Sequence, residues 1–360
     1  MDANRGKADD ADDADDADDR QPVETGAKNS AHPYAALTPD RVLDALEGIG
    51  LRTDGRLLAL NSYENRVYLV GLDDGTQVVA KFYRPERWST EQILEEHAFM
   101  RELADSEIPV VPATPDGSGT TLHDDGTFRF SLFARRGGRA PELDDRETRL
   151  WIGRFLGRIH AVGAATPFVH RPALDRATFA IEPRDWIVAA GIVPAPLDTV
   201  WAGVVEHALA SVAHCEARAG EVATLRLHGD CHVGNILWTE AGASGHGGPH
   251  FVDFDDSRTG PALQDLWMLV SGTRQEMTAQ FADVLEGYEQ FREFDVRELH
   301  LLEALRTLRM IHYSAWIARR WGDPAFPAAF SFFGSEQYWQ NQILALREQI
   351  AAMDEAPLAL

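Results

Sequence analysis

One segment of this 360-residue chain constrains its fold more than any other. It reads HGDCHVGNILW at 228–238, and after a glycine-rich turn it continues with HFVDFDD at 250–256. The apolar stretches on either side of the turn have the length and residue types of two strands of a β-hairpin. Antiparallel pairing would place Asn235, at the start of the first strand, beside Asp253, near the end of the second.

This pair of residues predicts a metal site. An amide oxygen and a carboxylate held side by side are hard oxygen ligands of the kind that Mg²⁺ prefers. Asp230 precedes Asn235 in the loop that enters the hairpin, so it can present a second carboxylate near the metal. Phosphoryl transfer needs this arrangement, with a positioned base beside a hydroxyl and metal ions on the phosphates.

Zinc is the alternative metal for the same segment, because His228, Cys231 and His232 lie close together in the sequence. Their spacing fits no standard structural zinc pattern, and the chain has only one other cysteine, Cys215. A disulfide framework is excluded for the same reason, which favours a reducing compartment. We therefore expect a cytoplasmic protein.

Composition excludes further classes of function. The chain has 34 basic and 57 acidic residues, a formal charge of -23. A protein this acidic lacks the broad basic surface that binding to nucleic acid or to anionic lipid requires. No stretch approaches the ~18 apolar residues of a membrane helix. The N-terminus has no apolar run that would make a secretory signal. We expect no nucleic-acid or membrane partner.

The first residues carry part of this acidity. Residues 8–19 read ADDADDADDADD, and residues 1–20 hold nine Asp against three basic residues, a net charge of -6. Repelling charges without an apolar stripe predict a disordered leader over 1–36. We expect the ordered chain to begin at about Leu37.

Residues 37–135 have the pattern of a small α+β lobe. Thr38 and Pro39 form an N-cap and first position of a helix. The residue patterns then predict a hairpin, a helix and a further strand, in this order: 66–72 paired with 76–83, 90–104, and 128–133.

The helical period dominates residues 136–360. Trp151, Phe155 and Ile159 recur at the spacing of one helix face, and similar patterns continue to the C-terminus. Only the segment around the hairpin interrupts them. The sequence therefore predicts an α+β protein with a small β-rich N-terminal lobe and a mostly helical C-terminal lobe.

The motif HGDxxxxN followed by a strand-borne Asp resembles the aminoglycoside phosphotransferase and choline kinase family, whose members have a protein-kinase-like fold. Longer strings are similar to a branch of bacterial Ser/Thr protein kinases with a role in stress response. The resemblance covers about residues 37 to 358. The strings are NSYENRVY (61–68), KFYRPERW (81–88), QILEEH (92–97), RLHGDCHVGNILW (226–238), GPALQDLWML (260–269) and RRWGDPAFP (319–327).

The resemblance implies roles for individual residues. Asp230 matches the catalytic base that accepts the proton of the substrate hydroxyl. Asn235 and Asp253 match the two Mg²⁺ ligands, with Asp253 in the place of the Asp of the DFG motif. Lys81 matches the lysine that binds the α- and β-phosphates of ATP. A lone lysine in the apolar run 78–81 agrees with that role, because it needs an anionic partner.

The resemblance also assigns residues around the nucleotide. Glu96 matches the glutamate that orients the lysine, although the adjacent Glu95 remains an alternative. Asn61 and Ser62 lie where other kinases have a glycine-rich phosphate loop. Phe133, Ala134 and Arg135 fall where a hinge would hold adenine.

Two departures from the protein-kinase pattern are informative. The phosphate loop at 60–65 contains no glycine, so its backbone cannot approach phosphates as freely, and the Ser62 hydroxyl is expected to replace the missing donors. Gly229 stands where eukaryotic protein kinases have an arginine that reads a phosphorylated activation loop. Fewer than ten residues separate Asp253 from the next helix, which leaves little room for such a loop.

The resemblance implies an ATP- and Mg²⁺-dependent kinase whose acceptor is a Ser or Thr of a protein, its own chain included. The alternative is a small-molecule kinase that acts on an aminoglycoside, choline or a sugar with the same ATP machinery. A pseudokinase is disfavoured because Lys81, Asp230, Asn235 and Asp253 are all present. We expect the protein to act as a monomer.

Overall fold

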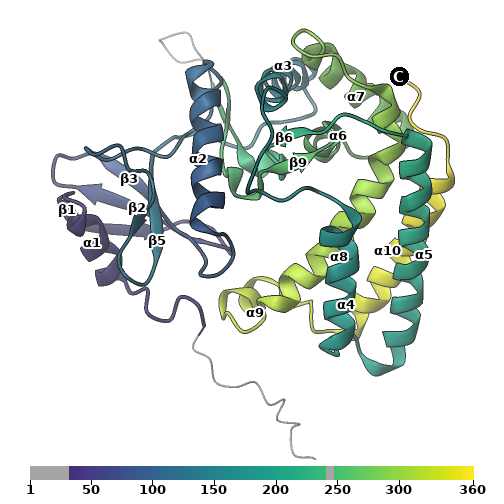
Figure 1. Ribbon diagram of the computed structural model, residues 1–360, viewed down its shortest axis with the longest axis horizontal. Coiled ribbons are helices and arrows are strands. Elements are labelled where there is room, and N and C mark those ends of the chain that lie inside the picture. Colours follow the sequence, from purple (N-terminus) through teal and green to yellow (C-terminus); the bar gives the residue numbers. More distant parts are fainter. Residues whose placement is uncertain (1–31, 241–246) are drawn as a thin grey trace, which may run out of the picture. The chain divides into compact units, whose positions relative to one another are not determined.

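The computed structural model describes residues 32–240 and 247–360 (Figure 1). The predicted disorder of the leader falls almost wholly on residues 1–31, which lie outside the described residues. Most of the glycine-rich turn, 241–246, lies outside them too. Two regions follow along the described chain, a sheet lobe over 32–134 and a helical lobe over 146–360. The α+β class with this order of lobes is confirmed.

The sheet lobe contains one antiparallel sheet with the strand order β1-β2-β3-β5-β4. Helix α1 (Pro39–Gly48) packs on it, and the Thr38 side chain caps the helix by accepting from the Arg41 N–H, as predicted. Tyr34 is already buried in this core, before the predicted start of order at 37. The strands are β1 (Thr53–Ala59), β2 (Arg66–Leu72), β3 (Gln77–Phe82), β4 (His123–Asp124) and β5 (Arg129–Ala134).

The predicted β2–β3 hairpin is confirmed, with Val67 opposite Lys81. Ala80 and Phe82 point into the core beneath α1. Successive side chains of a strand point to opposite faces, so Lys81 lies on the other face of the sheet.

Helix α2 (Thr90–Asp105) lies between the sheet and the helical lobe in Figure 1. It begins with a capping box in which Ser89 and Gln92 bond each other's backbone N–H groups. Its apolar residues Phe99, Met100 and Leu103 belong to the same buried cluster as residues of the helical lobe. The helix therefore joins the two regions through a shared core.

The helical lobe packs around two buried clusters. Helices α3 and α7 approach so closely that a Cβ at Gly153 would lie 2.0 Å from the Val284 carbonyl oxygen. Two short two-stranded sheets, β6 with β9 and β7 with β8, interrupt the helices. The helices are α3 (Arg146–Gly163), α4 (Glu182–Ala189), α5 (Ala195–Ala219), α6 (Leu263–Leu266), α7 (Arg274–Tyr288), α8 (Leu302–Arg319), α9 (Ala325–Ala329) and α10 (Glu336–Asp354). The strands are β6 (Leu225–Leu227), β7 (Ile236–Thr239), β8 (Gly248–Phe251) and β9 (Arg258–Gly260).

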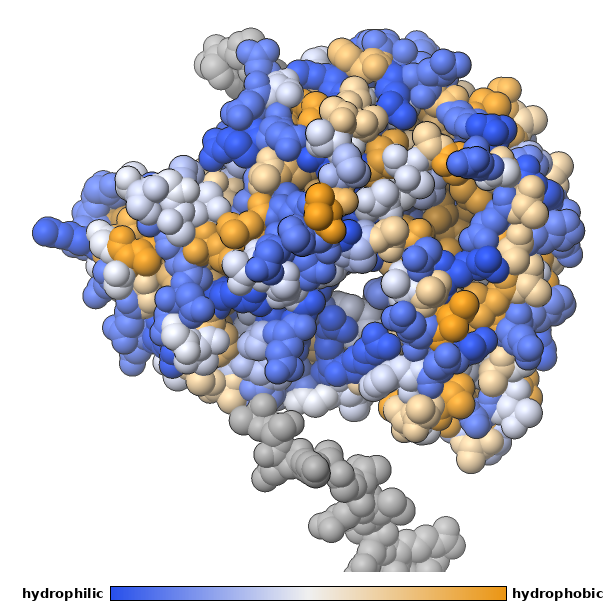
Figure 2. All heavy atoms as spheres, in the orientation of Figure 1, coloured by the Kyte–Doolittle hydropathy of each residue, from blue (hydrophilic) through white to orange (hydrophobic). Residues whose placement is uncertain are grey.

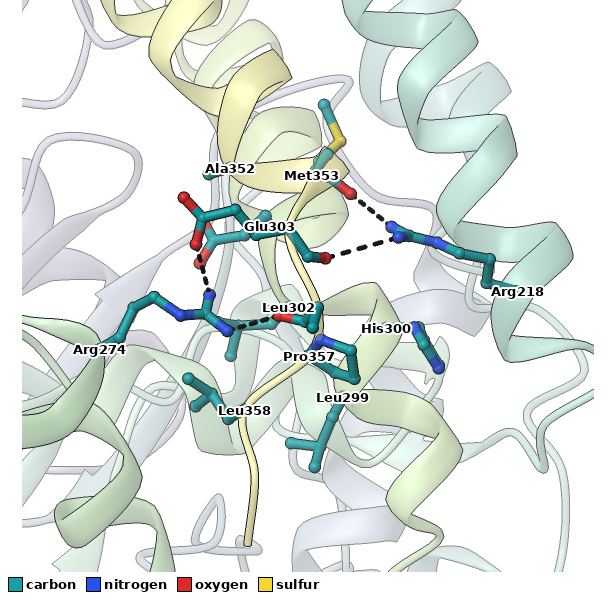
Figure 3. Close-up of a pocket in the computed structure, with 12 residues that line it drawn as sticks. Arg218, Arg274, Leu299, His300, Leu302, Glu303, Ala352, Met353, Pro357 and Leu358 are labelled. Atoms are coloured by element: carbon teal, nitrogen blue, oxygen red, sulfur yellow. Dashed lines mark hydrogen bonds and ion pairs between the residues drawn. The ribbon is translucent and has the colours of Figure 1, made fainter.

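The segment that follows α10 is fastened to the helical lobe in the small pocket of Figure 3. Arg218 donates to the Met353 carbonyl, and Arg274 donates to the Ala356 carbonyl and pairs with Glu355. None of the predicted site residues lines this pocket. Within the described ranges, no helix combines the length and the apolar character that crossing a membrane requires.

Candidate active site

The hairpin predicted around the glycine-rich turn is confirmed, with Ile236 of β7 opposite Phe251 of β8. Asn235 comes directly before β7, and the Val252 N–H donates to its carbonyl at 3.0 Å. Asp253 lies beyond the end of β8 rather than inside the strand. Its backbone is left-handed, with φ 59° and ψ 63°, a conformation that residues other than glycine seldom adopt. Such strain is typical of functional sites.

Asn235 and Asp253 leave oxygen atoms available for a cation. The Asn235 amide nitrogen donates to the Asp230 carbonyl at 3.0 Å, which leaves the amide oxygen free to act as a ligand. The Asp253 side chain is 54% exposed. Over 32–240 and 247–360, no group of three or more His, Cys, Asp or Glu is arranged to hold a metal by itself. The donor set therefore fits Mg²⁺, which usually takes one or two protein ligands and completes its shell with phosphates and water.

A buried carboxylate fixes the loop that carries Asp230. Asp265, in α6, accepts from the backbone N–H groups of His228 at 2.7 Å and Gly229 at 2.8 Å. Its Oδ2 atom also lies 3.1 Å from Nε2 of His160. Sequence reasoning did not single out Asp265 or His160, although Asp265 lies within the string GPALQDLWML.

Gly229 has a structural reason to lack a side chain. Its φ is 87°, and a Cβ would lie 2.1 Å from the Asp256 carbonyl oxygen. The arginine that protein kinases carry here cannot be accommodated in this backbone conformation. The chain then runs from Asp253 through β9 to α6 without room for a long activation loop.

Asp230 lies in the cleft between the guanidinium group of Arg309 and the imidazole ring of His232. Arg309 Nη1, from α8, lies 2.7 Å from its Oδ1, and His232 Nε2 lies 3.5 Å from its Oδ2. Burial alone would raise the pKa of Asp230, but the His232 hydrogen bond and the Arg309 charge hold it below its ordinary value. Asp230 is therefore ionised at neutral pH and can accept a proton or a hydrogen bond.

Lys81 contacts two carboxylates of the segment after β8. Its Nζ lies 3.0 Å from Asp253 and 3.0 Å from Asp255. Burial alone would lower the pKa of Lys81, but the charges of Asp253 and Asp255 raise it well above its ordinary value. Sequence reasoning missed Asp255, whose only signal was its position two residues after the predicted metal ligand.

The structure does not bring Glu96 or Glu95 into direct contact with Lys81. Glu96 is 1% exposed and pairs with Arg171 Nη2 at 2.5 Å. Glu95 faces another way and accepts from three successive backbone N–H groups at 169–171. Of the two, only Glu96 lies near enough for its charge to raise the pKa of Lys81.

A cleft of about 760 Å³ unites most of the predicted site residues. Figure 2 shows a hollow between the sheet lobe and the helical lobe, surrounded mainly by hydrophilic residues. Glu96 and Arg135 do not line the cleft, whereas Ala134 and Arg136 do. The predicted residues that line it are Asn61, Ser62, Lys81, Phe133, Asp230, Asn235 and Asp253.

Comparison with solved structures shows the fold. The amicoumacin kinase hAmiN, solved with AMP-PNP, Ca²⁺ and Ami, matches with a TM-score of 0.66 and 18% identity over 89% of this chain and 94% of that one. A microcompartment-associated aminopropanol kinase matches with the same TM-score and identity over 88% and 97% of the two chains. The protein therefore has the protein-kinase-like fold of these phosphotransferases.

Comparison with curated proteins shows closer relatives. Stress response kinase A of Escherichia coli K12 is 43% identical over 333 residues, 92% of this chain and 98% of that protein. The serine/threonine protein kinase RdoA of Salmonella typhimurium is 42% identical over 332 residues, with the same coverage. The family model described as "Phosphotransferase enzyme family" matches residues 56–302, a range that includes Lys81, Asp230, Asn235 and Asp253. The chain is therefore a kinase-type enzyme and belongs to the phosphotransferase enzyme family.

Proposed function

We propose that the protein is an ATP- and Mg²⁺-dependent Ser/Thr protein kinase. The observation that carries the proposal is the meeting of Lys81, Asp230, Asn235 and Asp253 around one cleft. Phosphoryl transfer requires a cation for the phosphates, ligands for a metal ion and a carboxylate near the acceptor hydroxyl. These residues supply all three from both lobes.

Lys81 is the cation for the α- and β-phosphates. Asp253 and Asp255 contact its ammonium group, and Lys81 lines the cleft. Asn235 and Asp253 are the residues that would hold Mg²⁺, which supplies charge neutralisation for the transferred phosphoryl group when bound.

Asp230 receives the acceptor hydroxyl. Its lowered pKa makes it a weak base, which is sufficient because the transition state of phosphoryl transfer is loose and needs little proton abstraction at its start. The carboxylate first orients the hydroxyl by accepting its hydrogen bond. It takes the proton as the new P–O bond forms and the bond from the γ-phosphorus to the bridging oxygen of ADP breaks. Arg309 and His232 keep the carboxylate in place from either side.

Two observations bear on the acceptor. The relatives that are 42–43% identical over nearly their whole length carry protein-kinase or stress-kinase names. The solved small-molecule kinases are only 18% identical, which shows a shared fold and says nothing about the acceptor. The proposal therefore takes a protein Ser or Thr as the acceptor. It also places the protein in the cytoplasm, because two free cysteines suit a reducing compartment.

The test offers labelled ATP and Mg²⁺ to the purified protein in two arms. One arm contains a generic basic protein, and the other contains an aminoglycoside, choline and simple sugars. Label on phosphoserine or phosphothreonine, absent from the Asp230→Asn variant, supports the proposal. Efficient transfer to a small molecule with none to protein would overturn the choice of acceptor. A protein that binds no ATP would overturn the proposal as a whole.

A further inference from the structure

The string RRWGDPAFP at 319–327 has no part in the catalytic geometry described above, yet it contains deeply buried charge. It spans the end of α8 and the start of α9 in the helical lobe. Asp323, in its centre, is 2% exposed. A carboxylate is seldom buried to this degree unless it is paired.

The partners of Asp323 come from the sheet lobe. Arg66 Nη2 lies 2.8 and 2.9 Å from its two carboxylate oxygens, and Arg84 Nη2 lies 2.7 Å from Oδ2. Arg66 begins β2 and Arg84 follows β3, so Asp323 spans the two lobes. Arg66 and Asp323 are 257 positions apart in the sequence.

A second carboxylate makes the reciprocal connection. Glu64 belongs to the phosphate loop, and its Oε2 lies 2.6 Å from Nε of Arg320. The indole N–H of Trp316 donates to the same oxygen at 2.5 Å. Arg84 Nε lies 2.8 Å from the other oxygen, Oε1, so Arg84 takes part in both connections.

These six residues form one network, with Arg84 and Asp323 buried and the other four half-buried. We call it the latch: Glu64, Arg66 and Arg84 on the sheet side, and Trp316, Arg320 and Asp323 on the helical side. The ring of Tyr63 also packs edge-on against Phe330, with 5.2 Å between centroids. Exposed ion pairs contribute little to a structure, but breaking a buried pair leaves an uncompensated charge and is costly. The phosphate loop therefore cannot lift from the helical lobe without breaking the latch.

The latch also sets the backbone of the loop. Arg84 Nε donates to the Glu64 carbonyl at 3.0 Å, and the Arg84 N–H donates to the Asn65 side chain at 3.1 Å. Ser62 Oγ donates to the Asn65 carbonyl at 2.9 Å, which closes the turn. In this conformation the Ser62 hydroxyl donates its hydrogen to the loop's own backbone, not to a phosphate. Side-chain hydrogen bonds therefore fix the shape of the loop.

We propose that the latch holds the glycine-free phosphate loop in its nucleotide-binding shape, which makes Asp323 and Arg320 positioning residues for the ATP phosphates although they lie in the helical lobe. The proposal rests on the proposed use of ATP. A loop that is already ordered loses little conformational freedom when the triphosphate binds. Glycine-rich loops reach the phosphates by flexibility, whereas this loop is pre-organised by ion pairs.

The experiment compares three variants of the full chain. Asp323→Asn removes the charge shared by Arg66 and Arg84. Arg320→Gln removes one partner of Glu64 and leaves Arg84, Trp316 and the more distant Arg87. Asp125→Asn is the matched control, because it removes a partly buried Asp–Arg pair of the sheet lobe that does not belong to the latch. Amide hydrogen exchange over 60–66 is measured without nucleotide, and Kd is measured for ATP-Mg²⁺ and for adenosine.

We expect the amides of residues 60–66 to exchange faster in the two latch variants. Their Kd for ATP-Mg²⁺ should rise about tenfold, a loss of about 1.4 kcal/mol. Their Kd for adenosine should stay within about twofold of the wild-type value. The control should change none of these. Unchanged exchange over 60–66, or equal weakening of ATP and adenosine, would overturn the positioning role. If Asp323→Asn does not fold, Arg320→Gln decides the matter alone. If the wild type binds neither ligand, the proposed function fails, and the exchange data still decide whether the latch orders the loop.

Discussion

Two loops line the same cleft, and a buried carboxylate holds each of them in a different way. The catalytic loop is held by Asp265, which comes from the same lobe and accepts backbone N–H groups. The phosphate loop is held by Asp323 of the opposite lobe, through arginine side chains. The contact with Asp265 uses backbone N–H groups, which nearly any residue would supply. The contact with Asp323 uses the guanidinium groups of two particular arginines.

This difference predicts how each loop fails. Backbone hydrogen bonds to a buried acid fix a loop almost regardless of its other side chains, so the catalytic loop should keep its shape when Asp230 is changed. The phosphate loop has hydrogen bonds within its own lobe, such as that from Arg84 to the Glu64 carbonyl, but the carboxylate that fixes it against the cleft is Asp323 of the other lobe. Changes around the catalytic loop should therefore stop the chemistry, whereas changes around the phosphate loop should weaken nucleotide binding.

The largest expected effect separates Asp230 from Asp253. Asp230→Asn removes the carboxylate proposed to receive the hydroxyl but leaves Lys81 and the two proposed metal ligands, Asn235 and Asp253, in place. Its kcat should fall by roughly 10²–10⁴, the usual scale for loss of general acid–base assistance, with near-normal affinity for ATP-Mg²⁺. Asp253→Ala should weaken Mg²⁺-dependent ATP binding as well as turnover, because the triphosphate loses its cation. Titration calorimetry with and without Mg²⁺, beside turnover rates, measures both.

The reverse result would exchange the two roles. If Asp230→Asn abolished ATP binding while Asp253→Ala retained it, Asp230 would be the metal ligand. The Asn235 hydrogen bond to the Asp230 carbonyl involves no side-chain atom of Asp230, so it should survive the substitution and keep the loop intact.

The next effect concerns the tight backbone of the catalytic loop. Gly229→Ala should lower the free energy of unfolding by about 2–4 kcal/mol, because a Cβ would lie 2.1 Å from the Asp256 carbonyl and φ is positive. Gly191→Ala is the control, since Gly191 also has a positive φ but has no atom within 4 Å of a Cβ. It should cost only about 1 kcal/mol. Chemical denaturation of both variants measures the difference, and equal losses would show that the loop yields to the added methyl group.

Much of the arrangement could be predicted because its signals are local. The Thr38 cap, the β2–β3 hairpin and the hairpin behind Asn235 each depend on residues close in sequence, and all three are confirmed. The hairpin pattern pointed to Asp230, Asn235 and Asp253, whereas the role of Lys81 came from the resemblance to the kinase family; all four residues line the cleft.

The parts that sequence reasoning missed depend on contacts between distant segments. Nothing in the local pattern pairs Arg66 with Asp323, because a charged residue near a helix end usually remains in solvent. Sequence reasoning also missed the partner of Glu96, which pairs with Arg171 and makes no direct contact with Lys81. Arg171, in the loop that follows α3, forms an ion pair with Glu96. Asp255 forms an ion pair with Lys81.

The smallest effect on activity is expected at Glu96. A substitution there tests whether Lys81 is oriented by this residue of the sheet lobe or by Asp253 and Asp255 of the helical lobe. Lys81 keeps Asp253 and Asp255 at 3.0 Å when Glu96 is neutralised. Glu96→Gln should therefore leave the Kd for ATP-Mg²⁺ within about threefold of the wild type, well under the tenfold that 1.4 kcal/mol represents. The cost should appear in stability, by about 1–3 kcal/mol, because the buried Arg171 loses its charged partner. Lys81→Met is the reference for complete loss of the lysine. If Glu96→Gln weakened ATP binding as much as Lys81→Met, Glu96 would orient Lys81 without direct contact. A residue of the sheet lobe, and not only Asp253 and Asp255, would then determine the position of the lysine.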